Sequence, residues 1–286
     1  VEAHGNFPTV VYPNPEEREA LTLALKKAKE TDADLVLAPD PDADRVGIAV
    51  KNNQGEFELL NGNQTGTCLI NYMLEAWEKE GKFTGKEYIV KTIVTSYMID
   101  KIAEDKGVDC YNTLTGFKYI GEIMTKLQGQ KTFIVGGEES YGYLVGEFVR
   151  DKDAVISCAF IAEMTAFYKD KGSSLYQALI DMYVKYGYYK EKLVSITKKG
   201  KSGAEEIKTM MERFRNNPPA ELGGSKVVAL MDYALRKETN VLTGESKAIE
   251  LPKSDVLQCI AEDGSIVSAR PSGTEPLIRV MAEGDD

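Results

Sequence analysis

Short apolar runs alternate with longer amphipathic stretches through the first two thirds of the chain. After Pro13-Asn14-Pro15, the apolar positions Leu21, Ala24, Leu25 and Ala28 recur at helical spacing, which predicts a helix reaching about residue 30. Compact apolar runs follow, as expected of buried strands. The predicted strands cover residues 35–38, 46–50 and 57–60. Residues 1–60 therefore form a strand-helix-strand piece, small for a domain and read as half of one.

A second region begins at Asn61-Gly62-Asn63-Gln64 and continues to residue 186. Strand-like and helix-like patterns alternate in it, which argues for a parallel sheet covered by helices. The expected strands are 88–94 and 132–135, and the expected helices are 67–80, 97–106, 118–127, 154–169 and 174–186.

From Tyr188 the pattern changes to an antiparallel sheet with helices on one face. The expected elements are strands 192–197, 227–233 and 256–260, a helix at 204–214 and a hairpin from 265 to 281. The predicted fold class is thus α/β with mixed parallel sheets, followed by an α+β C-terminal domain with an antiparallel sheet. We place the domains at 1–60, 61–186 and 187–286.

Charge and composition narrow the function. The net charge of −10 over 286 residues argues against nucleic acid or an anionic membrane as a partner. No apolar run approaches the roughly 20 residues of a membrane span. The four cysteines are widely spaced, which indicates reduced, buried thiols in a cytoplasmic protein. His4 is the only histidine, so Ser-His-Asp catalysis and histidine-based metal sites are excluded.

The most informative segment is Asp40-Pro41-Asp42-Ala43-Asp44-Arg45, which lies between two strand-like runs. Loops at the edges of open α/β sheets commonly carry the site. Three carboxylates at alternate positions repel one another, and a hard divalent cation such as Mg²⁺ relieves that repulsion. Arg45 supplies a planar fork that can hold a phosphate beside the metal. The loop therefore predicts phosphoryl chemistry.

Three other interpretations of this loop compete with that one. An EF-hand fails, because Arg45 and Lys51 stand where glycine and glutamate are required. A haloacid-dehalogenase-type phosphatase would use Asp42 as nucleophile and Asp44 as acid/base, but it needs a later acidic motif. The only Gly-Asp pair is Gly284-Asp285 at the end of the chain. An ordinary solvated acidic turn stays open for the hexapeptide taken alone.

A glycine-rich cluster, Gly136-Gly137-Glu138-Glu139-Ser140-Tyr141-Gly142, follows the expected strand at 132–135. Glycines let the backbone turn sharply and approach a ligand closely. A carboxylate in such a loop can accept hydrogen bonds from two adjacent sugar hydroxyls. A plain turn after a strand is the alternative.

A second cluster, Arg270-Pro271-Ser272-Gly273-Thr274-Glu275-Pro276, lies between two strand-like runs, with Arg279 shortly after it. Inward-turned N–H groups, two hydroxyls and one or two guanidinium groups make a phosphate-binding nest. An ordinary hairpin turn is the alternative.

The segment Thr115-Gly116-Phe117-Lys118 is less specific. Lys118 could neutralise a phosphate or assist proton transfer at a hydroxyl, or it could be a solvated lysine at a helix start.

Together the four clusters, in this order and spacing, resemble the α-D-phosphohexomutase family over essentially the whole chain. Glu-Glu-Ser-Tyr in the glycine-rich loop looks like the phosphoglucomutase branch. The resemblance implies part of a second α/β domain, a complete third one and the differently folded fourth domain. It also implies a cytoplasmic enzyme that interconverts glucose 1-phosphate and glucose 6-phosphate, using Mg²⁺, a phosphoserine and glucose 1,6-bisphosphate as intermediate.

The resemblance also implies roles for individual residues. The metal ligands would be Asp40, Asp42 and Asp44, with Arg45 and Lys118 at the transferring phosphoryl group. Sugar hydroxyls would bind Glu138 and Ser140, and the other phosphate would bind Arg270, Ser272, Gly273, Thr274 and Arg279.

One departure is important. The family's phosphoryl donor is a serine in a Thr-Ala-Ser-His-Asn-Pro type loop, and nothing in this sequence resembles it. We therefore expect a fragment of a phosphoglucomutase that lacks the phosphoserine domain and is inactive alone. A non-catalytic relative that binds sugar phosphates, and specificity for mannose or pentose phosphates, stay open. The sequence does not give the oligomeric state.

Overall fold

The computed structural model describes residues 4–198, 200–272 and 277–284. The chain divides into two compact units, Val1–Tyr186 and Gly187–Asp286, called the first and second unit below.

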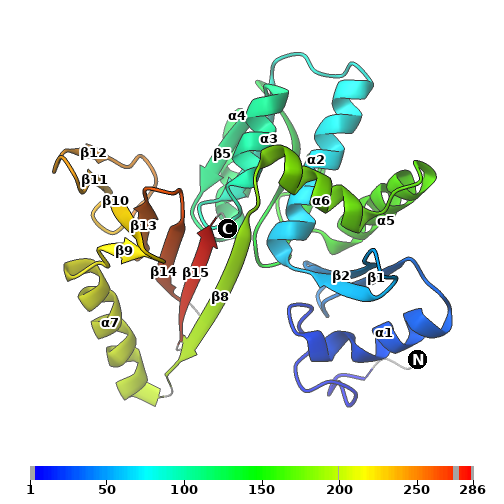
Figure 1. The fold of residues 1–286 in the computed structure, drawn as a ribbon, viewed down its shortest axis with the longest axis horizontal. Coiled ribbons are helices and arrows are strands. Elements are labelled where there is room, and N and C mark those ends of the chain that lie inside the picture. The colour runs from blue at the N-terminus through cyan, green and yellow to red at the C-terminus, as the bar shows by residue number, and fades with distance from the viewer. Residues whose placement is uncertain (1–3, 199, 273–276, 285–286) are drawn as a thin grey trace. The chain divides into compact units, whose positions relative to one another are not determined.

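The first unit opens with a short helix and a small sheet (Figure 1). Its elements are the 3₁₀ turn η1 Arg18–Leu21, helix α1 Thr22–Glu30, and strands β1 Leu35–Pro39, β2 Val46–Lys51 and β3 Phe57–Leu60. Leu21 and Ala28 pack against Val36 and Ala49 of the sheet. The predicted strands are confirmed, and the regular part of the predicted helix begins only at Arg18.

The three strands pair antiparallel in the order β1-β2-β3, and Pro39 lies opposite Val46. The acidic loop is therefore the connection of a hairpin. The two strand-like runs that flank it are confirmed as β1 and β2, and the small sheet they form is antiparallel rather than an open parallel one. A connection of six residues is too short for the crossover that joins parallel strands, so the spacing of the two runs is that of a hairpin.

The rest of the first unit alternates helices and strands, as predicted. Its elements are α2 Gly62–Lys79, β4 Glu87–Thr92, α3 Met98–Lys106, β5 Asp109–Thr113, α4 Phe117–Leu127, β6 Thr132–Gly137, β7 Tyr143–Val145, α5 Ala154–Asp170 and α6 Leu175–Tyr186. The sheet order is β5-β4-β6-β7; β4 is parallel to β5 and β6, whereas β7 is antiparallel to β6. The sequence did not reveal β5 and β7, because β5 is mostly polar and β7 has three residues.

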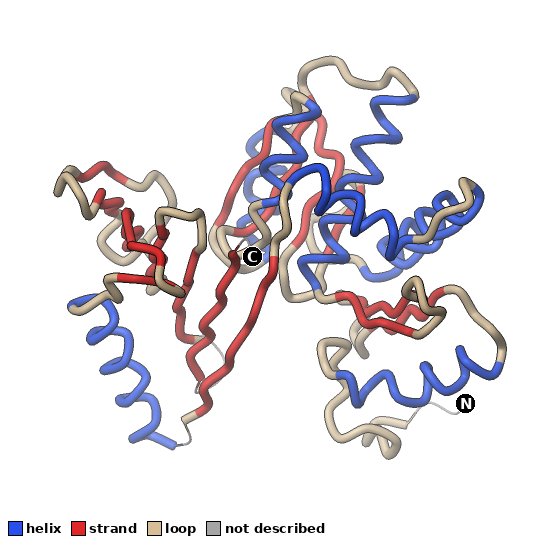
Figure 2. Tube along the Cα trace, viewed as in Figure 1, coloured by secondary structure: helices blue, strands red, loops and turns tan. Residues whose placement is uncertain are grey.

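This topology gathers three loops at one edge. In register, Thr92 lies opposite Thr113, and Lys91 opposite Gly137, so the parallel strands β4, β5 and β6 end together. Such an edge is where open parallel sheets carry their sites. Figure 2 shows the loops and turns in tan at the ends of the strands.

The second unit is built on an antiparallel sheet in the order β12-β11-β10-β13-β14-β15-β8, with β9 paired to β10. Its elements are β8 Lys190–Thr197, α7 Gly200–Asn216, β9 Glu221–Leu222, β10 Ser225–Asp232, β11 Lys237–Asn240, β12 Ser246–Ala248, β13 Leu257–Ala261, β14 Ile266–Pro271 and β15 Leu277–Gly284. Ile207 and Met211 of α7 pack on Ala269 and Ile278 of the sheet. The predicted antiparallel sheet covered on one face is confirmed.

Glu87, at the start of β4, is a buried carboxylate whose contribution to the stability of the first unit can be measured. The residue is 4% exposed, and its carboxylate accepts hydrogen bonds from the backbone N–H groups of Thr84, Gly85 and Lys86 at 3.0–3.1 Å. Burial acts to raise the pKa of Glu87, but these hydrogen bonds and the Thr84 hydroxyl outweigh it and leave the pKa below its ordinary 4.5.

We predict that Glu87→Gln lowers the free energy of unfolding at pH 7 by about 1–3 kcal/mol, since the variant loses charge-assisted hydrogen bonds. Because the folded-state pKa is depressed, the contribution of Glu87 is complete above pH 4.5 and is lost as pH falls through the folded value. Urea unfolding at pH 7 and at pH 3 measures this. The exposed Glu104→Gln is the control, and an unchanged difference between Glu87→Gln and the parent at the two pH values would contradict the assignment.

Candidate functional site

The acidic loop curls around Asp40. Oδ1 of Asp40 accepts the backbone N–H groups of Asp44 and Arg45, each at 3.0 Å, and its own N–H donates to the carbonyl of Arg45 at 3.1 Å. Ala43 has φ of 57°, which closes the turn. The loop is therefore held by hydrogen bonds from its own backbone to Oδ1 of Asp40. The other oxygen, Oδ2, lies 3.9 Å from Nε of Arg45.

The three predicted metal ligands come together. One carboxylate oxygen from each of Asp40, Asp42 and Asp44 lies within 4.8 Å of the other two. Oδ1 of Asp44 is buried and accepts no hydrogen bond from the described residues. Burial raises the pKa of Asp40, as do the negative charges of Asp44 and Asp42, against the backbone N–H groups that lower it. A buried oxygen without a donor and a set of repelling carboxylates fit a hard divalent cation.

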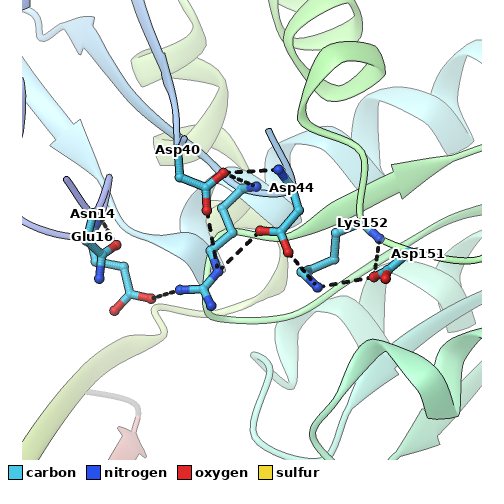
Figure 3. A network of polar contacts seen from close by, with 7 residues as sticks. Asn14, Glu16, Asp40, Asp44, Asp151 and Lys152 are labelled. Atoms are coloured by element: carbon cyan, nitrogen blue, oxygen red, sulfur yellow. Dashed lines mark hydrogen bonds and ion pairs between the residues drawn. The ribbon is translucent and has the colours of Figure 1, made fainter. Parts of the chain in front are cut away.

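Arg45 lies among carboxylates. Its Nε is 3.5 Å from Asp44 and 3.9 Å from Asp40, and its Nη1 is 3.6 Å from Glu16. Figure 3 shows Asp40 and Asp44 close together, with Glu16 on one side and Lys152 on the other. Sequence reasoning missed Glu16, which lies directly after the Pro-Asn-Pro turn, where the side chain of Asn14 accepts its N–H at 3.0 Å.

Lys152 is the other residue that the sequence did not reveal. Its Nζ is 3.0 Å from Asp44 and 3.1 Å from Asp151, and it lies 5.6 Å from the centre of the Phe117 ring. The aliphatic part of its side chain packs against Gly142, where an added Cβ would lie 2.1 Å from Cδ of Lys152. Burial acts to lower the pKa of Lys152, but its two aspartate partners outweigh burial and raise it. The Arg150-Asp151-Lys152-Asp153 run before α5 was the available sequence signal.

The glycine-rich loop docks on the acidic loop. The carbonyl of Tyr141, a residue with φ of 69°, accepts the N–H of Val46 at 3.0 Å. The N–H of Ala154 likewise donates to the carbonyl of Ala43 at 2.9 Å. Ser140 lies half-buried beside this contact. Backbone bonds thus join segments that are far apart in sequence.

Glu138 is 7% exposed, and its Oε1 accepts the N–H of Gly116 at 2.7 Å. Gly116 has φ of 115°, a conformation that suits glycine. The Thr-Gly-Phe-Lys segment therefore meets the glycine-rich loop. Lys118 itself is exposed, with Nζ 4.9 Å from the centre of the Tyr119 ring. Among the described contacts, the lysine that reaches the acidic loop is Lys152.

In the second unit, Arg270 of β14 lies directly opposite Arg279 of β15. The preceding residues, Ala269 and Ile278, face α7, so alternation along the strands places both arginines on the other face of the sheet. Two cations opposite each other repel, which favours an anion between them. The N–H of Ser272 donates to the carbonyl of Leu277 at 2.8 Å. Gly273 and Thr274 lie outside the described residues.

Two general expectations can be compared with the structure. The cysteines are unpaired; Cys68 and Cys259 are buried, as predicted, whereas Cys110 and Cys158 are only partly buried. Within the described residues, no helix has the length and apolar character needed to cross a bilayer.

Comparisons with known proteins show the family of the chain. The family model described as phosphoglucomutase/phosphomannomutase alpha/beta/alpha domain II matches residues 1–55, that of alpha/beta/alpha domain III residues 61–186, and that of the C-terminal domain residues 221–286. The chain belongs to the α-D-phosphohexomutase family.

Within that family its relatives place it in the phosphoglucomutase branch. It is 34% identical over 98% of its length to a phosphoglucomutase of Staphylococcus saprophyticus, and 36% identical over 98% to one of Staphylococcus epidermidis. The chain spans about half the length of these relatives, 50% in both cases.

Solved structures show the same fold. The phosphoglucomutase parafusin of Paramecium, in an open form, aligns with 96% of this chain and 45% of its own at a TM-score of 0.62 and 17% identity. A phosphoglucomutase/phosphomannomutase family protein of Burkholderia thailandensis aligns with 99% of this chain and 49% of its own. The TM-score is 0.61 and the sequence identity is 17%.

We predict that Lys152→Met lowers the free energy of unfolding of the first unit by about 1–2 kcal/mol without added metal. The reason is that Asp44 then keeps its like-charged neighbours but loses a partly buried cation. Chemical unfolding measures the difference. Lys126→Met is the matched control, because Lys126 pairs with Glu122 on an exposed helix face and should contribute about 0.5 kcal/mol or less. Equal effects of the two substitutions would count against the role of Lys152.

Proposed function

We propose that this chain is the metal-, sugar- and phosphate-binding part of a phosphoglucomutase. The complete protein would interconvert glucose 1-phosphate and glucose 6-phosphate through a bisphosphate intermediate. The observation that carries the proposal is the junction of the acidic loop with the glycine-rich loop through Val46 and Tyr141. A cluster of metal-type carboxylates beside a sugar-type loop is the arrangement that phosphoryl transfer between sugar hydroxyls requires.

In this proposal Asp40, Asp42 and Asp44 hold Mg²⁺. When bound, the ion would neutralise charge on the phosphoryl group being transferred. The chain prepares this site by tying down one oxygen of two ligands: Oδ1 of Asp40 accepts two N–H groups, and Oδ2 of Asp44 pairs with Lys152. Their other oxygens, Oδ2 of Asp40 and Oδ1 of Asp44, lie 3.9 and 3.5 Å from Nε of Arg45, and Oδ1 of Asp44 accepts no hydrogen bond from the described residues.

The remaining residues bind and orient the substrate. Arg45 and Lys118 would contact the transferring group, where positive charge stabilises the developing negative charge. Glu138 and Ser140 would bind sugar hydroxyls; Oε1 of Glu138 is fixed by Gly116, which orients the carboxylate. The other phosphate would bind residues of the C-terminal loop and its flanking strands. These are Arg270, Ser272, Gly273, Thr274 and Arg279.

The phosphoserine loop expected from the family has no counterpart among these 286 residues. We therefore propose that the chain by itself binds hexose phosphate and metal but does not turn the substrate over. That observation also keeps a second function open, a sugar-phosphate-binding relative without chemistry. Glucose rather than mannose or pentose phosphate is proposed because the named relatives are phosphoglucomutases.

We predict that the chain binds Mn²⁺, used as a paramagnetic substitute for Mg²⁺, and that Asp42→Asn weakens this binding at least about tenfold, because one anionic ligand is lost. Electron paramagnetic resonance titration measures free Mn²⁺ directly. Asp170→Asn, an exposed aspartate at the end of α5, is the control and should bind as the parent does. If Asp42→Asn binds Mn²⁺ as tightly as Asp170→Asn, the acidic loop is not the metal site.

We predict that Arg270→Ala weakens binding of glucose 1-phosphate about tenfold, since a charge-assisted contact to phosphate is removed. Isothermal calorimetry measures the affinity. Arg213→Ala, an exposed arginine on α7 of the same unit, removes the same charge and should leave affinity unchanged. The same affinity in both variants would exclude Arg270 from the phosphate site.

A further inference from the structure

The second carboxylate of the glycine-rich loop, Glu139, has no role in the proposed function. It is 9% exposed, and its Oε2 accepts the hydroxyl of Thr92 at 3.2 Å. The hydroxyls of Thr92 and Thr95 are 2.8 Å apart. Both threonines are buried, at 0% and 3% exposure, at the carboxyl end of β4. Burying a charged group costs free energy unless the group is hydrogen-bonded. The hydrogen bond from the Thr92 hydroxyl therefore stabilises the Glu139 carboxylate at this edge of the sheet.

The turn that carries these threonines is itself held firmly. Lys91, which is fully buried, donates from Nζ to the carbonyl of Thr95 at 3.0 Å and pairs with Asp100 at 2.9 Å. The same Nζ lies 4.4 Å from the centre of the Tyr97 ring. Because the same Nζ binds the carbonyl of Thr95 and the carboxylate of Asp100 on α3, it ties the turn after β4 to that helix.

The backbone at Glu139 is fixed as well. An added Cβ on Gly62, at the start of α2, would lie 1.8 Å from the carbonyl oxygen of Glu139, so a glycine is needed for this close approach. The hydroxyl of Tyr143 donates to the carbonyl of Gly62 at 2.7 Å. Next to it, Asn63 accepts the N–H of Ser96 at 2.9 Å, which ties α2 to the turn after β4.

Glu138 and Glu139 therefore make different contacts. Glu138 meets Gly116 in the loop before α4, whereas Glu139 meets Thr92 in the turn after β4. Ser140 and Tyr141 follow directly, and the carbonyl of Tyr141 carries the junction with the acidic loop. The position of Glu139 thus sets where the residues on both sides of it lie.

We propose that Glu139 is a positioning residue for sugar recognition: seated on the Thr92–Thr95 hydroxyl pair, it orients Glu138 and Ser140 without contacting the sugar. The inference rests on the proposed function, because it assigns Glu138 and Ser140 to the sugar hydroxyls. We expect metal binding to depend less on Glu139 than sugar binding does, since the acidic loop is also held by its own bonds to Asp40.

Thr92→Val tests the proposal, because it removes the hydroxyl while nearly keeping the shape of the side chain. We expect the affinity for glucose 1-phosphate, measured by calorimetry, to fall about tenfold through loss of a hydrogen bond to a charged group. Affinity for Mn²⁺ should stay close to the parent value, whereas the melting temperature should fall, because Glu139 stays buried and loses a hydrogen-bond donor. Thr92→Ser, which keeps the hydroxyl, should restore sugar-phosphate binding, and the exposed Thr125→Val on α4 is the control.

Glu139→Gln is the second variant, and should also weaken glucose 1-phosphate binding while leaving Mn²⁺ binding intact. Parent-like glucose 1-phosphate affinity in both Thr92→Val and Glu139→Gln would overturn the proposal. So would a parallel loss of melting temperature and of both affinities, which is the result expected of a purely structural role. If the parent chain binds Mn²⁺ but not glucose 1-phosphate, the proposed sugar site fails, and this inference fails with it. If the parent chain binds glucose 1-phosphate and both variants bind it equally well, only the inference about Glu139 fails.

Discussion

The mutual repulsion of three carboxylates in one hairpin connection is the constraint on which the first unit depends. Asp40, Asp42 and Asp44 are held within reach of one ion, although like charges at this spacing oppose one another. The fold offsets the repulsion with two backbone N–H groups on Asp40 and with the side chains of Arg45 and Lys152. A turn that would otherwise spread apart is kept compact, which is the geometry that the proposed divalent cation needs.

The same contacts make the surrounding loops into one assembly. Lys152 reaches the acidic loop from the segment before α5, and the backbone of that segment bonds to Ala43 through Ala154. The glycine-rich loop joins the acidic loop through Tyr141 and the loop before α4 through Glu138. Chemistry that depends on placing charge accurately benefits from such bracing, because each supporting group is itself fixed by others.

Long periodic segments of the sequence predicted their elements well, and short or polar ones did not. Helices such as α5 and α6 and strands such as β2 contain enough apolar residues to be predicted from the sequence alone. β7 has three residues, and β11, Lys237–Asn240, is entirely polar. Strands of this kind form because a neighbouring strand offers backbone partners, and that information lies elsewhere in the chain.

By itself the sequence determined the chemistry of the clusters: the alternating aspartates of the acidic loop, the carboxylates of the glycine-rich loop and the arginines near the C-terminus. Such groups lie close in the chain, so their spacing already limits what they can bind. Only the tertiary structure decided that Lys152 rather than Lys118 reaches Asp44, and that Glu139 accepts a hydrogen bond from Thr92. Those partners come from distant segments, and packing and backbone hydrogen bonding, which no local pattern encodes, bring them together.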